Sequence, residues 1–520
     1  MVRHTIPGVT ALWRAVLAGV IALAFFLPSP ASAAGPEGQL TWAVHVSLAP
    51  AWFDPAETPS LITPFMILPA LHDALVKPMP GAPMAPSLAQ SWSQSKNGTS
   101  YEFVLRKGVK FHNGDPLTAE DVKFSVERYK GAAAKLFKDN VIDVEVVDPH
   151  RIRFRLKQPW PDFMTFFGTP AAGIAWIVPK KYLQQVGDEG FKRAPVGAGP
   201  YKFVSFKPGV ELVLEAFEGY WRKVPSVKRL VLRVVPDEST RLAMLKRGEA
   251  DIAYSIRAAL AEEVRRTPGL KLAGIVIPAS FWIDFVDQWD PKSPWRDRRV
   301  RLAANLAIDR DAINSAETLG FSKVHANFIP QTFEYYWTAP PYPHDPGQAK
   351  KLLAEAGYPN GFDAGEYYCD TAYANLGEAV VNYFGAVGIR ARLRPMERAA
   401  FFQQYREKKL KNLVQAASGA FGNAATRIEA YATRGGLYTY GTHPEIDGLF
   451  SEQLRETNPR VRKAILEKIQ QIIHERVMYA PIWDLGFLSG VGPRVAESGL
   501  GLITGHPYSA PYEDLKLKTK

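Results

Sequence analysis

Apolar and polar residues alternate with a period of two in several short stretches, and this pattern predicts strands with one buried face. Tyr101, Phe103 and Leu105 form such a face, and the preceding Asn97-Gly98 pair suits a tight hairpin turn because both residues tolerate positive φ. Further strands of this kind are predicted at residues 210–214 and 231–235.

Other stretches repeat apolar residues every three or four positions behind a capping residue, and this predicts helices. Thr118 and Asp121 resemble a capping box, after which Val122, Val126 and Tyr129 share one helical face. Further helices are predicted behind Asp237, Asp297, Asp345-Pro346 and Asn458-Pro459, the last with Val461, Ile465, Ile469 and Ile472 as its buried stripe. The mixture of strands and capped helices fits an α/β protein with mixed sheets.

The N-terminus has the features of a cleavable secretory signal. Arg3 and Arg14 are basic, and the apolar run over residues 15–27 is shorter than the ~20 residues that a membrane span needs. Ala31-Ser32-Ala33 offers small residues for cleavage. We therefore predict a signal peptide at residues 1–33 and export of the mature protein to a periplasmic space. No Cys follows the cleavage region, so we expect no lipid anchor there.

The remaining composition narrows the possible functions. Cys369 is the only cysteine, so it cannot form an intrachain disulfide, and we interpret it as a small buried residue. The formal net charge is +11, but no basic run with interleaved aromatic residues occurs. We therefore predict no nucleic-acid partner.

The most informative stretch is residues 85–130, which contains the segment Phe111-His112-Asn113-Gly114-Asp115-Pro116-Leu117-Thr118-Ala119-Glu120-Asp121. The stretch resembles the family 5 extracellular solute-binding proteins, which are the peptide- and nickel-binding receptors of ABC importers. Shorter segments resemble the same family in the same order: Phe53-Asp54-Pro55, Gly197-Ala198-Gly199-Pro200-Tyr201, Gly219-Tyr220-Trp221, Gly248-Glu249-Ala250-Asp251-Ile252, Ala307-Ile308-Asp309-Arg310 and Tyr479-Ala480-Pro481-Ile482.

The resemblance implies a two-lobed periplasmic-binding-protein fold with a hinge between the lobes and an extra subdomain on the first lobe. We expect the first lobe at residues 34–285, with the inserted subdomain at about 60–195. The second lobe is expected at residues 286–485, and residues 486–520 are expected to return to the first lobe. Ligand would be held between the lobes.

One departure from the family bears on the ligand. Peptide-binding members usually carry an acidic Asp-Tyr-Pro-Asp-Pro stretch in which one aspartate holds the ammonium of the ligand. Residues 417–427 correspond to it, contain no aspartate, and end in Arg427. A guanidinium binds carboxylates or phosphates in a bidentate way, so Arg427 or Arg434 favours an anionic ligand. The alternative is that these arginines face water or pair with Glu429.

Candidate ligand contacts follow from the cleft that the resemblance implies, because its walls are strand ends and loops. Aromatic side chains would cover apolar parts of the ligand, and polar groups would orient it. The predicted contacts are His45, Ser47, Phe281, Trp282, Asp284, Phe421, Asn423, Arg427, Trp483 and Asp484.

The sequence favours a receptor over an enzyme. No Gly-x-Ser-x-Gly elbow, His-Glu-x-x-His helix or P-loop occurs, so we predict no catalytic residue, resident metal or cofactor. The expected partners are a small-molecule ligand and the membrane permease subunits of an ABC importer, and the expected state is a monomer. Two alternatives remain open here: a metal-chelate receptor, for which His443 is the candidate residue, and an exported enzyme on the same scaffold.

Overall fold

Two long strands, β12 (Lys271–Asp284) and β17 (Tyr479–Val491), pair antiparallel at the centre of the main sheet. The computed structural model describes residues 1–2, 35–58, 62–131, 133–168, 173–419 and 421–518. Residues 36–520 form one unit, and this unit is described below. The predicted signal peptide at residues 1–33 lies almost wholly outside the described residues. No helix within the described ranges is long and apolar enough to cross a membrane.

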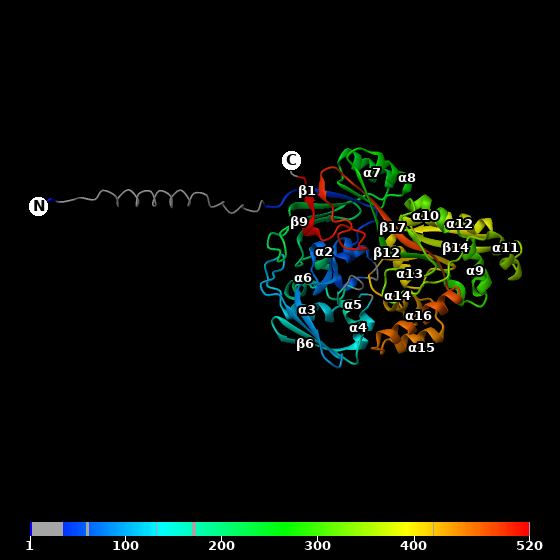
Figure 1. Ribbon diagram of the computed structural model, residues 1–520, viewed down its shortest axis with the longest axis horizontal. Coiled ribbons are helices and arrows are strands. Elements are labelled where there is room, and N and C mark those ends of the chain that lie inside the picture. Colours follow the sequence, from blue (N-terminus) through cyan, green and yellow to red (C-terminus); the bar gives the residue numbers. More distant parts are fainter. Residues whose placement is uncertain (3–34, 59–61, 132, 169–172, 420, 519–520) are drawn as a thin grey trace. The chain divides into compact units, whose positions relative to one another are not determined.

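The main sheet has strands on both sides of the β12–β17 pair, as Figure 1 shows. Its order is β15-β14-β16-β12-β17-β11-β1-β10-β9-β8, with β13 also paired to β17. The strands are β1 (Glu37–Val44), β8 (Tyr201–Lys207), β9 (Glu211–Ala216), β10 (Val227–Val234), β11 (Ile252–Tyr254), β13 (Lys323–Val324), β14 (Phe362–Asp370), β15 (Ile389–Met396) and β16 (Leu413–Ser418). We call β1 and β8–β11 with their packed elements the first lobe, and β14–β16 with theirs the second lobe.

The β12–β17 pair belongs to both lobes. Residues 271–276 of β12 pair with residues 486–491 of β17, at the end where β11 adds the first-lobe strands. Residues 280–284 pair with residues 479–484, where β16 adds the second-lobe strands. The register shifts between Val276 and Ser280. The irregularity thus lies where the sheet passes from one lobe to the other. The lobe boundaries given above stay a prediction.

A second, four-stranded sheet carries its own core. Its order is β4-β5-β7-β6, formed by β4 (Ala89–Gln94), β5 (Ser100–Leu105), β7 (Arg151–Leu156) and β6 (Val141–Asp148). Buried Tyr101, Phe103 and Leu105 lie on one face of β5, which confirms the predicted strand. They pack with the helices α3 (Ala119–Glu127), α4 (Ala134–Asn140) and α5 (Phe163–Gly168), while α6 (Lys180–Arg193) follows. We call this unit the inserted subdomain.

Most predicted helices form behind their predicted caps. The Asp121 carboxylate accepts hydrogen bonds from the backbone N–H and hydroxyl of Thr118, at the start of α3. Asp237 caps α7 (Glu238–Arg247), and the residue that follows this helix, Gly248, adopts the left-handed conformation. The remaining helices are α2 (Leu68–Leu71), α7 (Glu238–Arg247), α8 (Ala258–Arg266), α9 (Arg298–Ala307), α10 (Arg310–Thr318), α11 (Pro346–Glu355), α12 (Ala374–Ala386), α13 (Arg398–Arg406), α14 (Ala424–Ala432), α15 (Pro444–Gln453) and α16 (Pro459–Glu475). Four short strands complete the fold: β2 (Val76–Met79), β3 (Ala82–Pro86), β18 (Val495–Glu497) and β19 (Lys516–Leu517).

Two predicted positions differ from the structure. Val210 is exposed in the turn before β9, which begins at Glu211, so the apolar face of that strand starts at Leu212. Val461 is exposed in the first turn of α16, before the helix packs against the second-lobe core, whereas Ile465 is buried. In both cases the apolar periodicity continues beyond the packed part of the element, outside β9 for Val210 and in the unpacked first turn of α16 for Val461.

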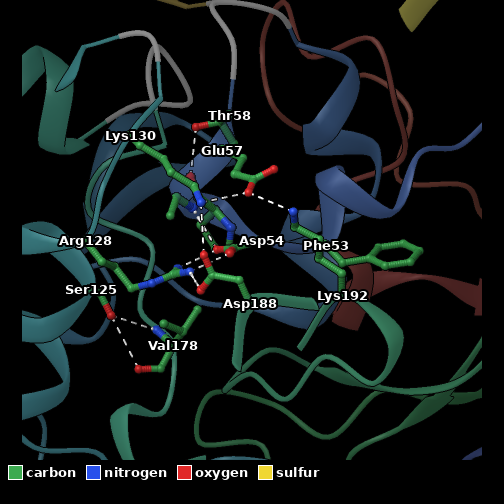
Figure 2. Close-up of polar contacts among 12 residues, drawn as sticks. Phe53, Asp54, Glu57, Thr58, Ser125, Arg128, Lys130, Val178, Asp188 and Lys192 are labelled. Atoms are coloured by element: carbon green, nitrogen blue, oxygen red, sulfur yellow. Dashed lines mark hydrogen bonds and ion pairs between the residues drawn. The ribbon is translucent and has the colours of Figure 1, made fainter. Parts of the chain in front are cut away.

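A network of charged groups joins the first lobe to the inserted subdomain, as Figure 2 shows. Asp54, which is fully buried, accepts two 2.7 Å hydrogen bonds from Arg128, and Arg128 also donates to Asp188. Lys130 bridges Asp188 and Glu57, each at 3.0 Å. The Phe53-Asp54-Pro55 segment therefore has a structural role: its carboxylate holds the loop that ends α3.

A second ionic contact joins the inserted subdomain to the second lobe. Asp162, between β7 and α5, forms an ion pair with Arg462 of α16, and both side chains are only 4 % exposed. Asp162 also accepts a 2.6 Å hydrogen bond from the side-chain amide of Asn423, while Arg462 donates to Gln453 at 2.9 and 3.0 Å. The charges are thus buried, paired and hydrogen-bonded, and this contact holds the two lobes together in this structure.

We predict that Asp162→Ala lowers the free energy of unfolding by about 3–5 kcal/mol, because it leaves the Arg462 charge buried without a carboxylate. Asp139→Ala is the matched control, since it removes the carboxylate of an exposed pair with Lys135 and is expected to cost less than about 1 kcal/mol. Denaturant unfolding of both variants measures the difference. Equal stability of the two variants would contradict the presence of the Asp162–Arg462 pair in the ligand-free protein.

Candidate ligand-binding site

A cavity lies beside the β12–β17 pair, where the sheet passes between the lobes. The second lobe supplies much of its wall from β14, α13 and β16, and the first lobe and the C-terminal segment supply the rest. The lining residues are Ile62, Ile277, Ala279, Phe281, Asp370, Tyr373, Arg398, Phe401, Phe402, Gln415, Ala417, Ser418, Gly419, Leu485, Phe487, Pro507 and Tyr508.

The charged groups of this wall are Arg398 and Asp370. Arg398 begins α13, and its Nη1 donates to Asp370 at the end of β14. Its Nε and Nη2 donate to the hydroxyl of Thr63 in the first lobe, at 3.1 and 2.6 Å. The Arg398 and Asp370 side chains are 12 % and 7 % exposed. Desolvation opposes the charge of Arg398, but Asp370 outweighs it and raises the pKa of the guanidinium. The cavity therefore presents a paired, ionised side-chain couple.

Aromatic rings form much of the remaining wall. Phe281 and Tyr373 meet edge to face at 4.8 Å, and Phe401 meets Phe402 in the same way at 5.0 Å. The Arg398 guanidinium lies over the Phe402 ring, 5.1 Å from its centre. Rings at these positions can cover an apolar ligand body while the ion pair orients its polar end.

Two further cavities adjoin this one. An open cavity of about 1020 Å³ shares Arg398 and Phe402 with it, and continues to Lys130 and Glu57, which belong to the charged network in Figure 2. A cavity of about 510 Å³ shares Phe281, Tyr373, Leu485 and Phe487 with it and reaches the α8, α10 and α12 ends. Each of the two thus has wall residues in common with the first cavity, and the open one is lined by charged side chains.

Of the ten predicted contacts, Phe281 lines the central cavity and Trp483 lines the 510 Å³ cavity. His45 is buried just after β1, and its ring meets that of Phe487 at 5.6 Å. Burial lowers the pKa of His45 well below its usual value, and the charges of Arg241 and Arg398 lower it further. His45 thus lies behind the cavity wall as a neutral ring.

Three predicted residues lie in packed positions of the second lobe, and two of them, Asp284 and Asp484, are hydrogen-bonded there. Trp282 is buried among Phe328, Tyr431 and Tyr479. Asp284 accepts a 2.7 Å hydrogen bond from the Tyr405 hydroxyl, and Asp484 accepts one of 2.7 Å from Ser280. Asp484 also accepts from the backbone N–H of Gln331, and His325 Nε2 lies 3.0 Å from it. Another predicted contact, Ser47, is half-buried after β1.

The loop that replaces the acidic stretch contributes to the cavity through Ser418 and Gly419. Asn423 caps α14 and contacts Asp162, and Phe421 meets the ring of His506 at 6.3 Å. Arg427 donates to the Ser418 carbonyl at 3.1 Å and lies over the Phe333 ring, and burial lowers its pKa to about 10. Ala420 lies outside the described residues. Arg427 is therefore placed behind the loop, and the guanidinium in the cavity wall is that of Arg398.

Sequence reasoning missed most of the wall, including its charged and tyrosine residues Arg398, Asp370, Tyr373 and Tyr508. One local signal marks Arg398: it occupies the first helical position of α13, where a cation is unfavourable beside the positive end of the helix dipole. A local rule broken in this way often marks a functional position. The other wall residues carry no comparable signal. Among the described residues, no cluster of three or more His, Cys, Asp or Glu side chains is placed to hold a metal ion.

The chain belongs to the bacterial extracellular solute-binding proteins, family 5, because the sequence model of that family matches residues 83–438. It is 28% identical over 443 residues to heme-binding protein A of Haemophilus influenzae, covering 79% of this chain and 80% of that protein. It is also 28% identical over 414 residues to the glutathione-binding protein GsiB of Salmonella choleraesuis, covering 76% of this chain and 79% of that protein.

Solved structures support the fold. The ABC transporter-associated periplasmic binding protein DppA from Helicobacter pylori, in complex with peptide STSA, matches with a TM-score of 0.79 at 24% sequence identity. The match covers 93% of this chain and 98% of that one. The predicted family and two-lobed periplasmic-binding-protein fold are confirmed. The family consists of solute-binding proteins that deliver small ligands to ABC permeases, so the chain is a binding protein and not an enzyme.

We predict that Asp284 makes the stability of the protein fall as the pH rises from about 4 to about 7. Burial raises the pKa of this carboxyl from 3.8 to about 7 in the folded protein, although Tyr405 and Lys408 oppose the shift. Between these values the folded state keeps a proton that the unfolded chain releases, so stability is lost as the pH rises through that window. The expected loss is on the order of a few kcal/mol.

Asp284→Asn cannot release a proton and is expected to lose this part of the pH dependence. Unfolding free energies at several values between pH 4.5 and 7.5 would measure this dependence. The range stops below pH 8 because the pKa of the neighbouring Lys408 is lowered to about 8, and titration of that group would add its own pH dependence. Asp311→Asn, an exposed position on α10, is the control and should keep the wild-type profile. A wild-type profile in Asp284→Asn would refute the assignment.

Proposed function

We propose that this chain is the periplasmic substrate-binding component of an ABC importer and captures a small organic solute in the cavity beside β12 and β17. The observation that carries the proposal is the cavity itself: its wall combines first-lobe and second-lobe residues with the strands that pass between the lobes.

Ligand binding would favour the closed arrangement because the ligand touches both lobes. A ligand shifts a conformational equilibrium only by its difference in affinity for the two states. Arg398 of the second lobe contacts Thr63 of the first, and Gly419 is packed against Ile62. When the lobes separate, these contacts are lost and each lobe keeps only part of the wall. The closed form is therefore the one that binds tightly.

The charges near the cavity favour a ligand with acidic character. The sequence analysis also predicted an anionic ligand, but from Arg427 or Arg434. Two guanidinium groups, Arg241 and Arg398, lower the pKa of His45. Arg398 is already paired with Asp370, so the further positive charge near His45 is that of buried Arg241. Arg241 donates to the backbone carbonyls of Val235, Pro236 and Ser255. A ligand carboxylate would offset this positive field. An acidic peptide-like solute fits this charge distribution and the aromatic wall.

We predict that Ala417→Trp abolishes ligand-induced stabilisation, because Ala417 lines the cavity and an indole would fill it. Melting temperatures would be measured with dipeptides, opines, sugar acids and nickel chelates, and native mass spectrometry with and without a chelator would identify any bound species. At least one class should raise the wild-type melting temperature and show a one-to-one complex. The control is Ala354→Trp, at an exposed position of α11, which should respond like the wild type.

Stabilisation of Ala417→Trp equal to that of the wild type would place the ligand elsewhere. No stabilisation of the wild type by any class would contradict capture of a small organic solute.

A further inference from the structure

We propose that Arg398 and Asp370 together bind the α-amino-acid head group of the ligand, that is, an ammonium and a carboxylate carried by one carbon atom. The inference rests on the proposed function, because it places the ligand in the cavity beside β12 and β17. It adds the chemical class of the bound group and the two side chains that hold it, which no motif in the sequence indicates.

The guanidinium of Arg398, a residue that lines the cavity, has more N–H groups than its printed contacts use. It has five N–H groups, of which one on Nε and one on Nη2 donate to Thr63 and one on Nη1 donates to Asp370. Each terminal nitrogen therefore has one N–H left. Two N–H groups on neighbouring nitrogens are the arrangement that binds a carboxylate through both of its oxygens.

Asp370 keeps complementary capacity. Its Oδ1 accepts a 3.0 Å hydrogen bond from the backbone N–H of Ala372, and its Oδ2 accepts from Arg398. Each carboxylate oxygen can accept two hydrogen bonds, so one site on each oxygen is open to an ammonium. Since Arg398 and Asp370 are in direct contact, the ligand groups that they bind must also be close together, as they are on one α-carbon.

Charge balance excludes simpler head groups. Arg398 and Asp370 neutralise each other, and both are mostly buried, so a lone anion would meet the Asp370 carboxylate and a lone cation would meet the Arg398 guanidinium. Each of these leaves a buried charge without a partner, which is costly. A head group with both charges leaves none.

The geometry also separates this ligand from an ordinary peptide. In an α-linked peptide the terminal ammonium and carboxylate lie at opposite ends of the chain. In a γ-linked peptide, the first residue carries both groups on its α-carbon. Arg398 and Asp370 therefore select for γ-linked or side-chain-linked amino-acid derivatives over α-linked peptides of the same composition.

The test compares γ-glutamylglycine, its N-acetyl derivative and α-glutamylglycine by calorimetric titration of the full mature protein. We expect γ-glutamylglycine to bind at least tenfold more tightly than the other two probes. In Asp370→Asn the preference for the free amine should vanish, while affinity for the N-acetyl derivative changes by less than threefold. Arg398→Gln should weaken all three probes by at least tenfold. The matched controls are Asp363→Asn on β14 and Arg394→Gln on β15, which are exposed and should bind like the wild type.

The comparison on wild-type protein needs no variant, so it decides the matter even if Asp370→Asn fails to fold. Equal affinity for the free and N-acetylated probes, or a preference for α-glutamylglycine, would overturn the assignment. If no free-head probe binds while a sugar acid or a nickel chelate binds and Ala417→Trp abolishes that binding, the head-group assignment falls and the proposed function stands. Failure of every class with the wild type refutes both.

Discussion

The antiparallel pairing of β12 with β17 is the interaction on which the rest of the structure depends. One end of this backbone ladder carries the first-lobe strands and the other carries the second-lobe strands, so both lobes share a single hydrogen-bonded sheet. Irregular register increases the local bend and twist of a sheet, and the β12–β17 register shifts between Val276 and Ser280 and again between Phe281 and Trp282. The same short stretch supplies Ile277 and Ala279 to the cavity wall. Hinge and ligand site are thus built from neighbouring residues.

Charged contacts set how the lobes and the inserted subdomain are held. Asp54 and Arg128 fix the subdomain to the first lobe, whereas Asp162 links it to Arg462 and Asn423 of the second lobe. Asn423 caps the helix behind the loop that lines the cavity through Ser418 and Gly419. Contact between the lobes and the shape of the ligand site are therefore coupled through one loop. A receptor that must close around its ligand and later release it needs such coupling.

The motifs that mark the family in this sequence have structural roles in this protein. Gly197 and Gly199 approach the backbone of residues 70–72 so closely that a side chain at either position would collide with it. Trp221 donates a 2.7 Å hydrogen bond to buried Asp73. Such positions tolerate few residue types, so they are easy to recognise in a sequence. The cavity wall is instead made of Arg398, Asp370 and aromatic rings, whose identity depends on the ligand.

The sequence by itself determined the α/β class, the family, the caps of most helices and the burial of Cys369, because these depend on local periodicity, local hydrogen bonds or strict steric requirements. Only the tertiary structure decided which side chains line the cavity. Phe281 and Trp282 are neighbours in the chain, yet the first lines the cavity and the second packs in the core, because successive residues of a strand point to opposite faces. Ser280 and Asp484, 204 positions apart, meet through strand register. Arg398 and Asp370 pair because the end of β14 lies beside the start of α13, and no short-range pattern encodes that approach.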